Sequence, residues 1–257
     1  MDLEQDQLRE FLDAKVKQYN RPFFIESDPI SIPHRFHTKE DIEIAGFLTA
    51  IISWGNRVSI LKNASRMMDL MGNNPYDFVM NHQETDLKRM EGFVHRTFNS
   101  SDLIVFIIAL KQLYATQNGL EGIFNTYKTE DSLQPAIHHL KQLFFTVPHL
   151  PRTRKHVSDP YAGSAAKRIN MFLRWMVRSD DAGVDFGIWK TISPAILSCP
   201  LDVHSGNVAR KLGLLSNKQN NAKAVHELDQ ALRQLDPDDP VKYDYALFGL
   251  GVFEKLR

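Results

Sequence analysis

Apolar side chains recur every three or four positions along most of this chain, which is the spacing of one face of an α-helix. The first such segment runs from Leu3 to Tyr19 and is closed by Asn20-Arg21-Pro22, a combination that ends helices. The alternating pattern typical of β-strands, internal repeats and low-complexity tracts are not evident. The pattern therefore predicts an all-α protein.

The segment from Ile42 to Trp54 is apolar on nearly all faces, which predicts a buried central helix. Residues 38–41, Thr-Lys-Glu-Asp, have the composition of its N-terminus, and Gly55-Asn56 ends it. An amphipathic helix from Val58 to Met71 follows. Further helices are expected at about 75–82, 84–91, 101–117, 119–128, 132–145, 163–178, 185–190, 204–214, 221–235 and 240–253.

Composition narrows the possible functions. The 31 basic and 31 acidic side chains cancel, which argues against a protein that coats nucleic acid by charge alone but leaves room for a local basic face. Because Cys199 is the only cysteine, an intrachain disulfide, a zinc knuckle and a four-cysteine iron–sulfur cluster are excluded. The acidic, polar start is unlike a signal peptide, and the apolar runs are short for a membrane span. We expect a cytoplasmic protein of a bacterium, with no membrane partner.

A first candidate site is the segment 161–168, Tyr-Ala-Gly-Ser-Ala-Ala-Lys-Arg, which opens a predicted helix. Small residues directly before a helix allow backbone N–H groups to approach a phosphate. Lys167 falls within the first turns of that helix, where the helix dipole and Arg168 both disfavour a protonated amine and so favour a nucleophile. Taken alone, the segment favours a solvated surface lysine.

A second candidate site is the segment 199–204, Cys-Pro-Leu-Asp-Val-His, which precedes another predicted helix. Taken alone, Asp202 is an expected helix N-cap and His204 a packing or capping residue. No second histidine or carboxylate stands at metal-ligand spacing from His204, so we predict no metal site there.

The two segments together resemble the signature of the helix-hairpin-helix DNA glycosylase superfamily, which includes endonuclease III and the 8-oxoguanine glycosylases. The hairpin of that superfamily, Pro-Gly-Val-Gly-x-Lys, is matched loosely by residues 162–167, and its Val-Asp-x-His element closely by residues 201–204. Segments 47–56 and 245–251 are similar to its second helix and its closing helix, so the resemblance covers residues 42–257.

The chain departs from this signature at Ala162 and Ala165, where the superfamily has proline and its second hairpin glycine. The 35 residues from Lys167 to Asp202 exceed the separation in common members and are similar to that in archaeal 8-oxoguanine glycosylases. The iron–sulfur motif of endonuclease III is absent, so we expect no cofactor. The resemblance is to a bacterial branch of the superfamily.

The resemblance implies two helical lobes with a central cleft: residues 40–178, ending in the hairpin and its helix, and residues 1–39 plus 179–257. It implies that Lys167 attacks the sugar C1′ to form a Schiff base, and that Asp202 deprotonates the lysine or stabilises the sugar cation. Damaged double-stranded DNA is the implied partner, an oxidised purine the favoured lesion, and a nucleoid-associated monomer the expected state. The residues implied to contact DNA are Asn56, Arg57, Gly163, Ser164, Ala165, Arg168 and His204.

A run of basic residues agrees with this interpretation. From Arg152 to Arg178 there are seven basic side chains against the single acidic Asp159, a local net charge of +6. Arg174 and Arg178, one helical turn apart, fit a solvated helix face equally well. Trp54 is a candidate to stack on a base, although an aromatic residue that closes an apolar helix is more often core.

Two other hypotheses stay open. A catalytically inactive nucleic-acid-binding protein with the same fold would use the hairpin only for phosphate contact, and the alanines at 162 and 165 favour it. A helical interaction scaffold unrelated to DNA is favoured by the zero net charge.

Overall fold

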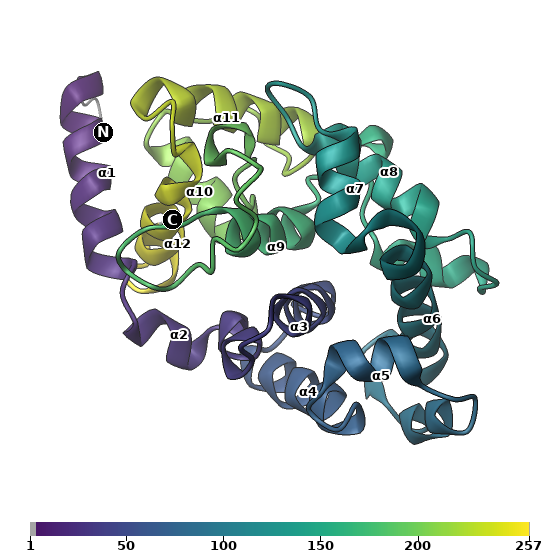
Figure 1. Ribbon diagram of the computed structural model, residues 1–257. Helices are drawn as coiled ribbons and strands as arrows, with labels where there is room; N and C mark the ends of the chain where they lie inside the picture. The colour runs from purple at the N-terminus through teal and green to yellow at the C-terminus, as the bar shows by residue number, and fades with distance from the viewer. Residues whose placement is uncertain (1–3, 257) are drawn as a thin grey trace. The chain divides into compact units, whose positions relative to one another are not determined.

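The computed structural model describes residues 4–256, and most of them are helical, which confirms the all-α prediction (Figure 1). The start of the first predicted helix, at Leu3, lies outside the described residues. The helices are α1 (Gln5–Tyr19), α2 (Phe23–Ser27), α3 (Lys39–Ile51), α4 (Arg57–Leu70), α5 (Pro75–Asn81), α6 (Ser100–Gln117), α7 (Gly119–Tyr127), α8 (Gln134–Phe144), α9 (Lys167–Val177), α10 (Val203–Lys211), α11 (Ala222–Leu235) and α12 (Tyr243–Val252). Short 3-10 turns connect several of them, including η3 (Asp86–Met90), η4 (Pro151–His156), η5 (Pro160–Ala162), η6 (Pro194–Ile196) and η7 (Pro240–Lys242).

The chain divides into two compact units, each made of discontinuous segments. Unit 1 contains residues up to 24, 128–135 and 158 onward, and unit 2 contains residues 25–127 and 136–157. This division differs from the predicted lobes, which separated Lys167 from Asp202, because α9 packs with the chain that follows it and both residues fall in unit 1.

Unit 1 is a bundle in which α12 packs against α1 on one side and α10 on the other (Figure 1). Two glycines permit these close approaches. A Cβ at Gly249 would lie 2.1 Å from the ring of Tyr19 in α1, and one at Gly251 would lie 3.1 Å from the Cβ of His204 in α10. The close packing of α12 against α1 and α10 therefore requires glycine at positions 249 and 251.

Unit 2 is organised around α3, whose residues from Ile42 to Ile51 are all buried, as the apolar pattern predicts. Thr38 caps its N-terminus by accepting a hydrogen bond from the backbone N–H of Asp41. A cluster of aromatic rings packs beside it, with Phe47, Phe98 and Phe144 all in contact with Phe106 of α6.

No single helix among residues 4–256 is long and apolar enough to cross a membrane. The bent pair α6 and α7, which meet at 63°, would reach the required length and composition together, and the apolar side chains of both are largely buried in unit 2.

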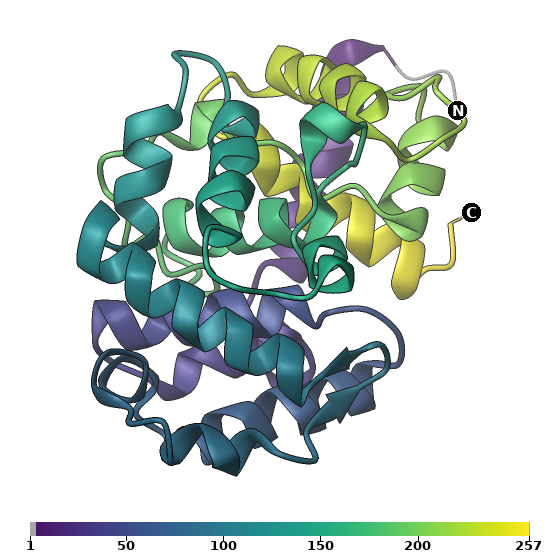
Figure 2. The same ribbon diagram turned by 90° about the vertical axis from the view of Figure 1, so that its right-hand side faces the viewer.

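Two local predictions were wrong. A short antiparallel hairpin, β1 (Val94–His95) with β2 (Phe98–Asn99), precedes α6 (Figure 2). The expected helix at 185–190 is an irregular segment, because the backbone N–H groups of Phe186 and Trp189 donate to carbonyls at the end of α9 and not to carbonyls within the segment. Strands of two residues are too short to show an alternating pattern.

We expect Gly249→Ala to destabilise the protein by about 1–3 kcal/mol, since the added methyl group must displace the ring of Tyr19. Urea denaturation measures the loss. The same substitution in a Tyr19→Leu background should cost much less, because the smaller side chain leaves room. Equal costs in both backgrounds would contradict the packing argument.

Candidate active site

The hairpin before α9 is a tight turn fixed by its own backbone. Asp159 accepts hydrogen bonds from Tyr161 N at its side chain, 3.0 Å, and from Ser164 N at its carbonyl, 3.1 Å. Gly163 follows with a φ of +86°, a left-handed conformation that favours glycine. Nothing lies within 4 Å of the point where its Cβ would be, so its backbone faces open space and a ligand could approach it closely.

The hairpin is held against α11. The backbone N–H of Ala222 donates to the carbonyl of Gly163, 3.1 Å, and Ser164 forms an isolated β-bridge with Asn221. Ala166, at the cap position of α9, has a φ of +46°, which costs a residue with a side chain of the order of 1 kcal/mol. This strain persists because the turn is anchored on both sides.

Lys167 is the first residue of α9, and its Nζ lies 3.6 Å from Oδ2 of Asp202. The two side chains, 35 positions apart in sequence, are both partly open to solvent, with 30% and 23% of their surface exposed. An exposed ion pair of this kind adds only about 0–1 kcal/mol to stability. Stability therefore gives little reason for the pairing, and its accessibility makes it a candidate for chemistry.

Asp202 is also the N-cap of α10. Its Oδ1 accepts hydrogen bonds from the backbone N–H groups of His204, 2.8 Å, and Ser205, 3.0 Å, while Ser205 Oγ accepts from Asp202 N. One oxygen is thus occupied by the helix and the other faces the lysine. The capping role expected for Asp202 and the pairing with Lys167 coexist in one carboxylate.

The loop after α10 fixes the backbone of Asp202 by a hydrogen bond. Asn220 donates from Nδ2 to the carbonyl of Asp202, 2.8 Å, and Arg210 donates to Asn220 Oδ1, 2.6 Å, and to the carbonyl of Asn217, 2.7 Å. Gly206 allows this contact, because a Cβ there would lie 2.7 Å from Asn220 Oδ1. Arg210 therefore helps to position Asp202 indirectly, by fixing the loop that contains Asn217 and Asn220.

Asn170 and Gln134 also position the hairpin, Gln134 through its contact with Asn170, and sequence analysis missed both. Asn170, buried in α9, donates from Nδ2 to the carbonyl of Ala165, 3.0 Å, and accepts at Oδ1 from Gln134, 3.1 Å. A signal was present, since Asn170 is a polar residue in the buried apolar stretch 169–173. A buried amide in such a place needs partners, and here one of them is the hairpin backbone.

The remaining hairpin and α10 candidates are only partly exposed. Arg168 is half-buried, and burial lowers the pKa of its guanidinium to about 10, so it stays protonated at neutral pH. Ser164 and Ala165 are half-buried, and Ser164 Oγ accepts from the backbone N–H of Ala166, 3.1 Å. His204 is half-buried where α10 approaches Gly251.

A buried ionic network lies under the ion pair and corrects the sequence interpretation of two arginines. Arg174 and Arg178 are buried, not part of a solvated basic face. Arg174 pairs with Asp185 and Asp244, and Arg178 with Asp180, Asp185 and Asp239. Both side chains are enclosed by protein because every residue of α9 from Ile169 to Val177 is buried.

Asp244 and Cys199 lie at the edge of this network nearest the site. Burial raises the pKa of Asp244 to about 6, and the charge of Arg174 opposes the rise. The site also acts on this pKa, since the charge of Asp202 raises it and that of Lys167 lowers it. Cys199 Sγ lies 4.0 Å from Asp244, and burial raises the pKa of this thiol well above its usual value. Cys199 is therefore held as an unreactive thiol.

Asn56 and Arg57 belong to unit 2, where they start α4. Asn56 is exposed and caps that helix by accepting from Ser59 N, 3.2 Å. Trp54 is half-buried, and its ring stacks on His156 with centroids 5.8 Å apart. Within residues 4–256, no group of three or more histidine, cysteine, aspartate or glutamate side chains is arranged to hold a metal ion.

We expect Arg178→Met to lower stability by about 3–5 kcal/mol, because the buried carboxylate of Asp185 keeps only Arg174 as its partner and the half-buried carboxylate of Asp239 loses its arginine. Thermal or urea denaturation provides the measurement. Arg21→Met, at an exposed arginine of the same unit, should change stability little. A similar small change for both variants would contradict the buried-network interpretation.

The two roles of Asp202 can be separated by stability. Asp202→Ala should cost about 1 kcal/mol through loss of the cap, like Asn221→Ala at the cap of α11, whereas Asp202→Asn retains a capping oxygen and should cost less. Urea denaturation curves of the three variants compare these losses. If Asn and Ala at position 202 are equally destabilising, the carboxylate contributes through charge and not through capping.

Comparison with known proteins gives the family but no activity. No curated protein and no solved structure matches the chain. One family model matches residues 28–253, which includes the hairpin, Lys167 and the α10 cap. By this match over most of its length, the chain belongs to the family described as Protein of unknown function (DUF2400).

Proposed function

We propose that this protein is a DNA glycosylase with lyase activity, which removes a damaged base through a covalent intermediate on Lys167. The observation that carries the proposal is the 3.6 Å approach of Lys167 Nζ to Asp202 Oδ2 at the first turns of two helices, in a place that solvent reaches. An amine nucleophile and a carboxylate base are the pair that such a reaction needs.

In the proposed reaction, Asp202 Oδ2 accepts a proton from the Lys167 ammonium, and the free amine attacks C1′ of the damaged nucleoside. The bond from C1′ to the base nitrogen breaks, and the base leaves with the proton that Asp202 took from the lysine. Opening of the sugar ring gives an iminium between Nζ and C1′. Loss of a C2′ proton then expels the 3′ phosphate by β-elimination, and water releases the lysine.

The position of Asp202 supports a second contribution to this reaction. Because α10 uses Oδ1, the Oδ2 atom stays directed at the reacting amine throughout. Where the amine loses its proton to solvent instead, Asp202 keeps its negative charge, which stabilises the positive charge that develops on the sugar as the base departs. Both contributions are lost when the carboxylate becomes an amide, although the cap is kept.

We propose double-stranded DNA containing an oxidised purine as the substrate, bound by a monomer in the bacterial cytoplasm. The open backbone at Gly163 and the protonated Arg168 support phosphate contact at the hairpin. Asn56 and Arg57 are proposed to contact the duplex where the nucleotide is extruded. In this proposal, units 1 and 2 are the lobes of a glycosylase-like fold.

One observation favours the alternative of an inactive DNA-binding protein. Asp202 caps α10, so the carboxylate has a structural reason to be present even without catalysis. In that case the hairpin would bind phosphates through its backbone, and Lys167 would be dispensable.

Borohydride trapping tests the proposal, because it reduces the iminium to a stable amine and leaves protein joined to DNA. Duplexes with an abasic site, an oxidised purine or an oxidised pyrimidine form the panel. We expect a covalent band with the native chain, none with Lys167→Ala, and a band formed about 10²-fold more slowly with Asp202→Asn. Lys223→Ala, which removes an exposed lysine from the first turn of α11, is the matched control and should trap like the native chain.

A covalent band that survives Lys167→Ala would assign the nucleophile elsewhere. Failure to trap any duplex, together with DNA affinity that Lys167→Ala leaves unchanged, would select the inactive DNA-binding protein. Absence of salt-dependent DNA binding would remove nucleic acid as the partner altogether.

A further inference from the structure

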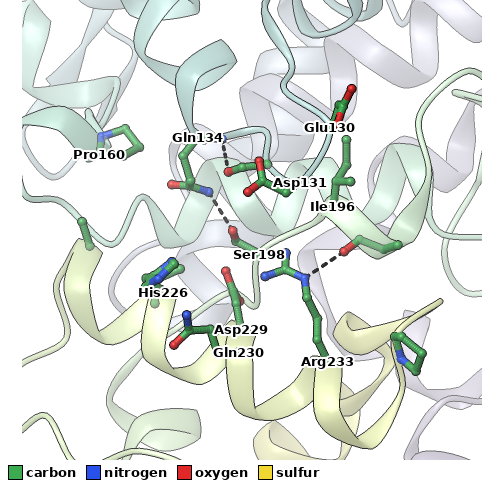
Figure 3. A pocket seen from close by; sticks show the side chains of 15 residues that line it. Glu130, Asp131, Gln134, Pro160, Ile196, Ser198, His226, Asp229, Gln230 and Arg233 are labelled. Atoms are coloured by element: carbon green, nitrogen blue, oxygen red, sulfur yellow. Dashed lines mark hydrogen bonds between the residues drawn. The ribbon is translucent and has the colours of Figure 1, made fainter.

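Unit 1 contains a pocket on the face of α11, separate from Lys167 and Asp202 (Figure 3). Its volume is about 600 Å³, within the range of sites that hold small molecules. Three segments and two single residues line it: the stretch 130–134, the stretch 195–198 around η6, one side of α11, Pro160 and Pro237. Its lining residues are therefore all from unit 1, and its shape does not depend on unit 2.

The charges around this pocket are predominantly negative. Glu130 and Asp131 are exposed at one side, and Asp229 lies across from them on α11 (Figure 3). The positive side chain of Arg233 also lines the pocket, and two of its nitrogens are already used, since Nε donates to the carbonyl of Ala195 and Nη2 to that of Leu197, both 3.0 Å. A ligand in this pocket would meet more negative than positive charge.

Asp229 differs from the other deeply buried carboxylates of unit 1. Asp185 and Asp244 each pair with an arginine, whereas no ion pair to Asp229 is found within residues 4–256. Asp229 is 5% exposed, and its carboxyl is hydrogen-bonded to the backbone N–H of Cys199, 2.8 Å, and to Ser198. It is thus a buried acid that has polar hydrogen-bond partners and makes no ion pair, with the charge of Arg233 acting on it through the pocket.

The lack of a directly paired cation has a physical cost. Burial raises the pKa of Asp229 to about 7, although the hydrogen bonds from Cys199 and Ser198 and the charge of Arg233 oppose the rise. Figure 3 shows the carboxyl group directed from α11 toward Ser198 and the pocket interior. A positive group in the pocket would supply the missing charge and favour the carboxylate form.

The apolar part of the lining indicates the rest of the ligand. Ile196, Val225, Pro160 and Pro237 contribute hydrocarbon surface between the polar groups. Such surface suits a chain of methylene groups better than a strongly hydrated ion. A bare metal ion fits poorly for a second reason, since the described residues hold no group of three metal-ligating side chains.

We propose that this pocket binds a small organic cation, an aliphatic chain that ends in an amine or guanidinium group, with its charged nitrogen against Asp229 and its chain along Ile196 and Val225. The acidic pair Glu130 and Asp131 attracts the cation and contacts a second charged end where the ligand has one. This site is independent of the DNA chemistry proposed for Lys167, and the two stand or fall separately.

Isothermal titration calorimetry with agmatine, which carries an amine at one end and a guanidinium at the other, tests the proposal. The full chain should bind agmatine, and 1,4-butanediol, which has a similar chain without charge, should bind at least about tenfold more weakly. Asp229→Asn keeps the shape and removes the negative charge, so it should weaken agmatine binding by about tenfold or more.

Glu130→Lys provides a second variant that leaves the buried residues untouched. Because Glu130 is exposed, the fold should tolerate the change, and repulsion should lower agmatine affinity severalfold. Asp181→Lys, at an exposed aspartate of unit 1 away from the pocket lining, is its control and should bind like the native chain.

Three results would overturn the proposal: no agmatine binding by the native chain, equal binding of the neutral diol, or affinity that neither Asp229→Asn nor Glu130→Lys reduces. Far-ultraviolet circular dichroism of each variant establishes that the helices are intact. If Asp229→Asn fails this control, Glu130→Lys and the diol decide the question. Borohydride trapping is not used here, so failure of the DNA proposal would leave this result unaffected.

Discussion

The buried pairing of Arg174 and Arg178 with aspartates is the interaction on which the candidate active site depends. A buried guanidinium is tolerated only where carboxylates meet it, so each pair fixes α9 against the segment that carries its partner. Asp244 joins α9 to α12, and Asp185 joins α9 to the irregular segment that follows it in the chain. Because a helix is stiff, pinning its C-terminal half also determines where Lys167 lies at its N-terminus.

The site combines structural and chemical demands in the same atoms. Asp202 satisfies the first amides of α10 with one oxygen and meets the amine with the other, so its orientation is set by the helix and needs no flexible loop. Asn170 likewise fixes the hairpin from within α9, by donating to its backbone. Such shared use gives a rigid arrangement from few residues, which suits chemistry that requires a fixed geometry.

Most helices could be predicted because their signals are local. Apolar spacing and caps such as Thr38 and Asn221 depend only on neighbouring residues. The spatial approach of Lys167 to Asp202 had no local signal and followed only from a resemblance, as did the roles proposed for both. The sequence interpretation failed for Arg174 and Arg178, since a charged residue on a helix looks the same whether solvent or a distant aspartate neutralises it. The pocket at Asp229 could not be predicted either, because its lining comes from stretches far apart in the sequence.

The pairing of α1 with α12 has a consequence for synthesis of the chain. The first described helix packs on the last one, through the contact of Tyr19 with Gly249. During translation α1 is made well before α12, so its apolar face, with Leu8, Leu12 and Val16, lacks its α12 contact until residues 243–252 have left the ribosome. Unit 1 is also interrupted by most of unit 2, so it can close only after the intervening residues have been made. The apolar face of α1 therefore stays exposed while residues 25–242 are being made, and a chaperone that covers this helix would act before unit 1 closes.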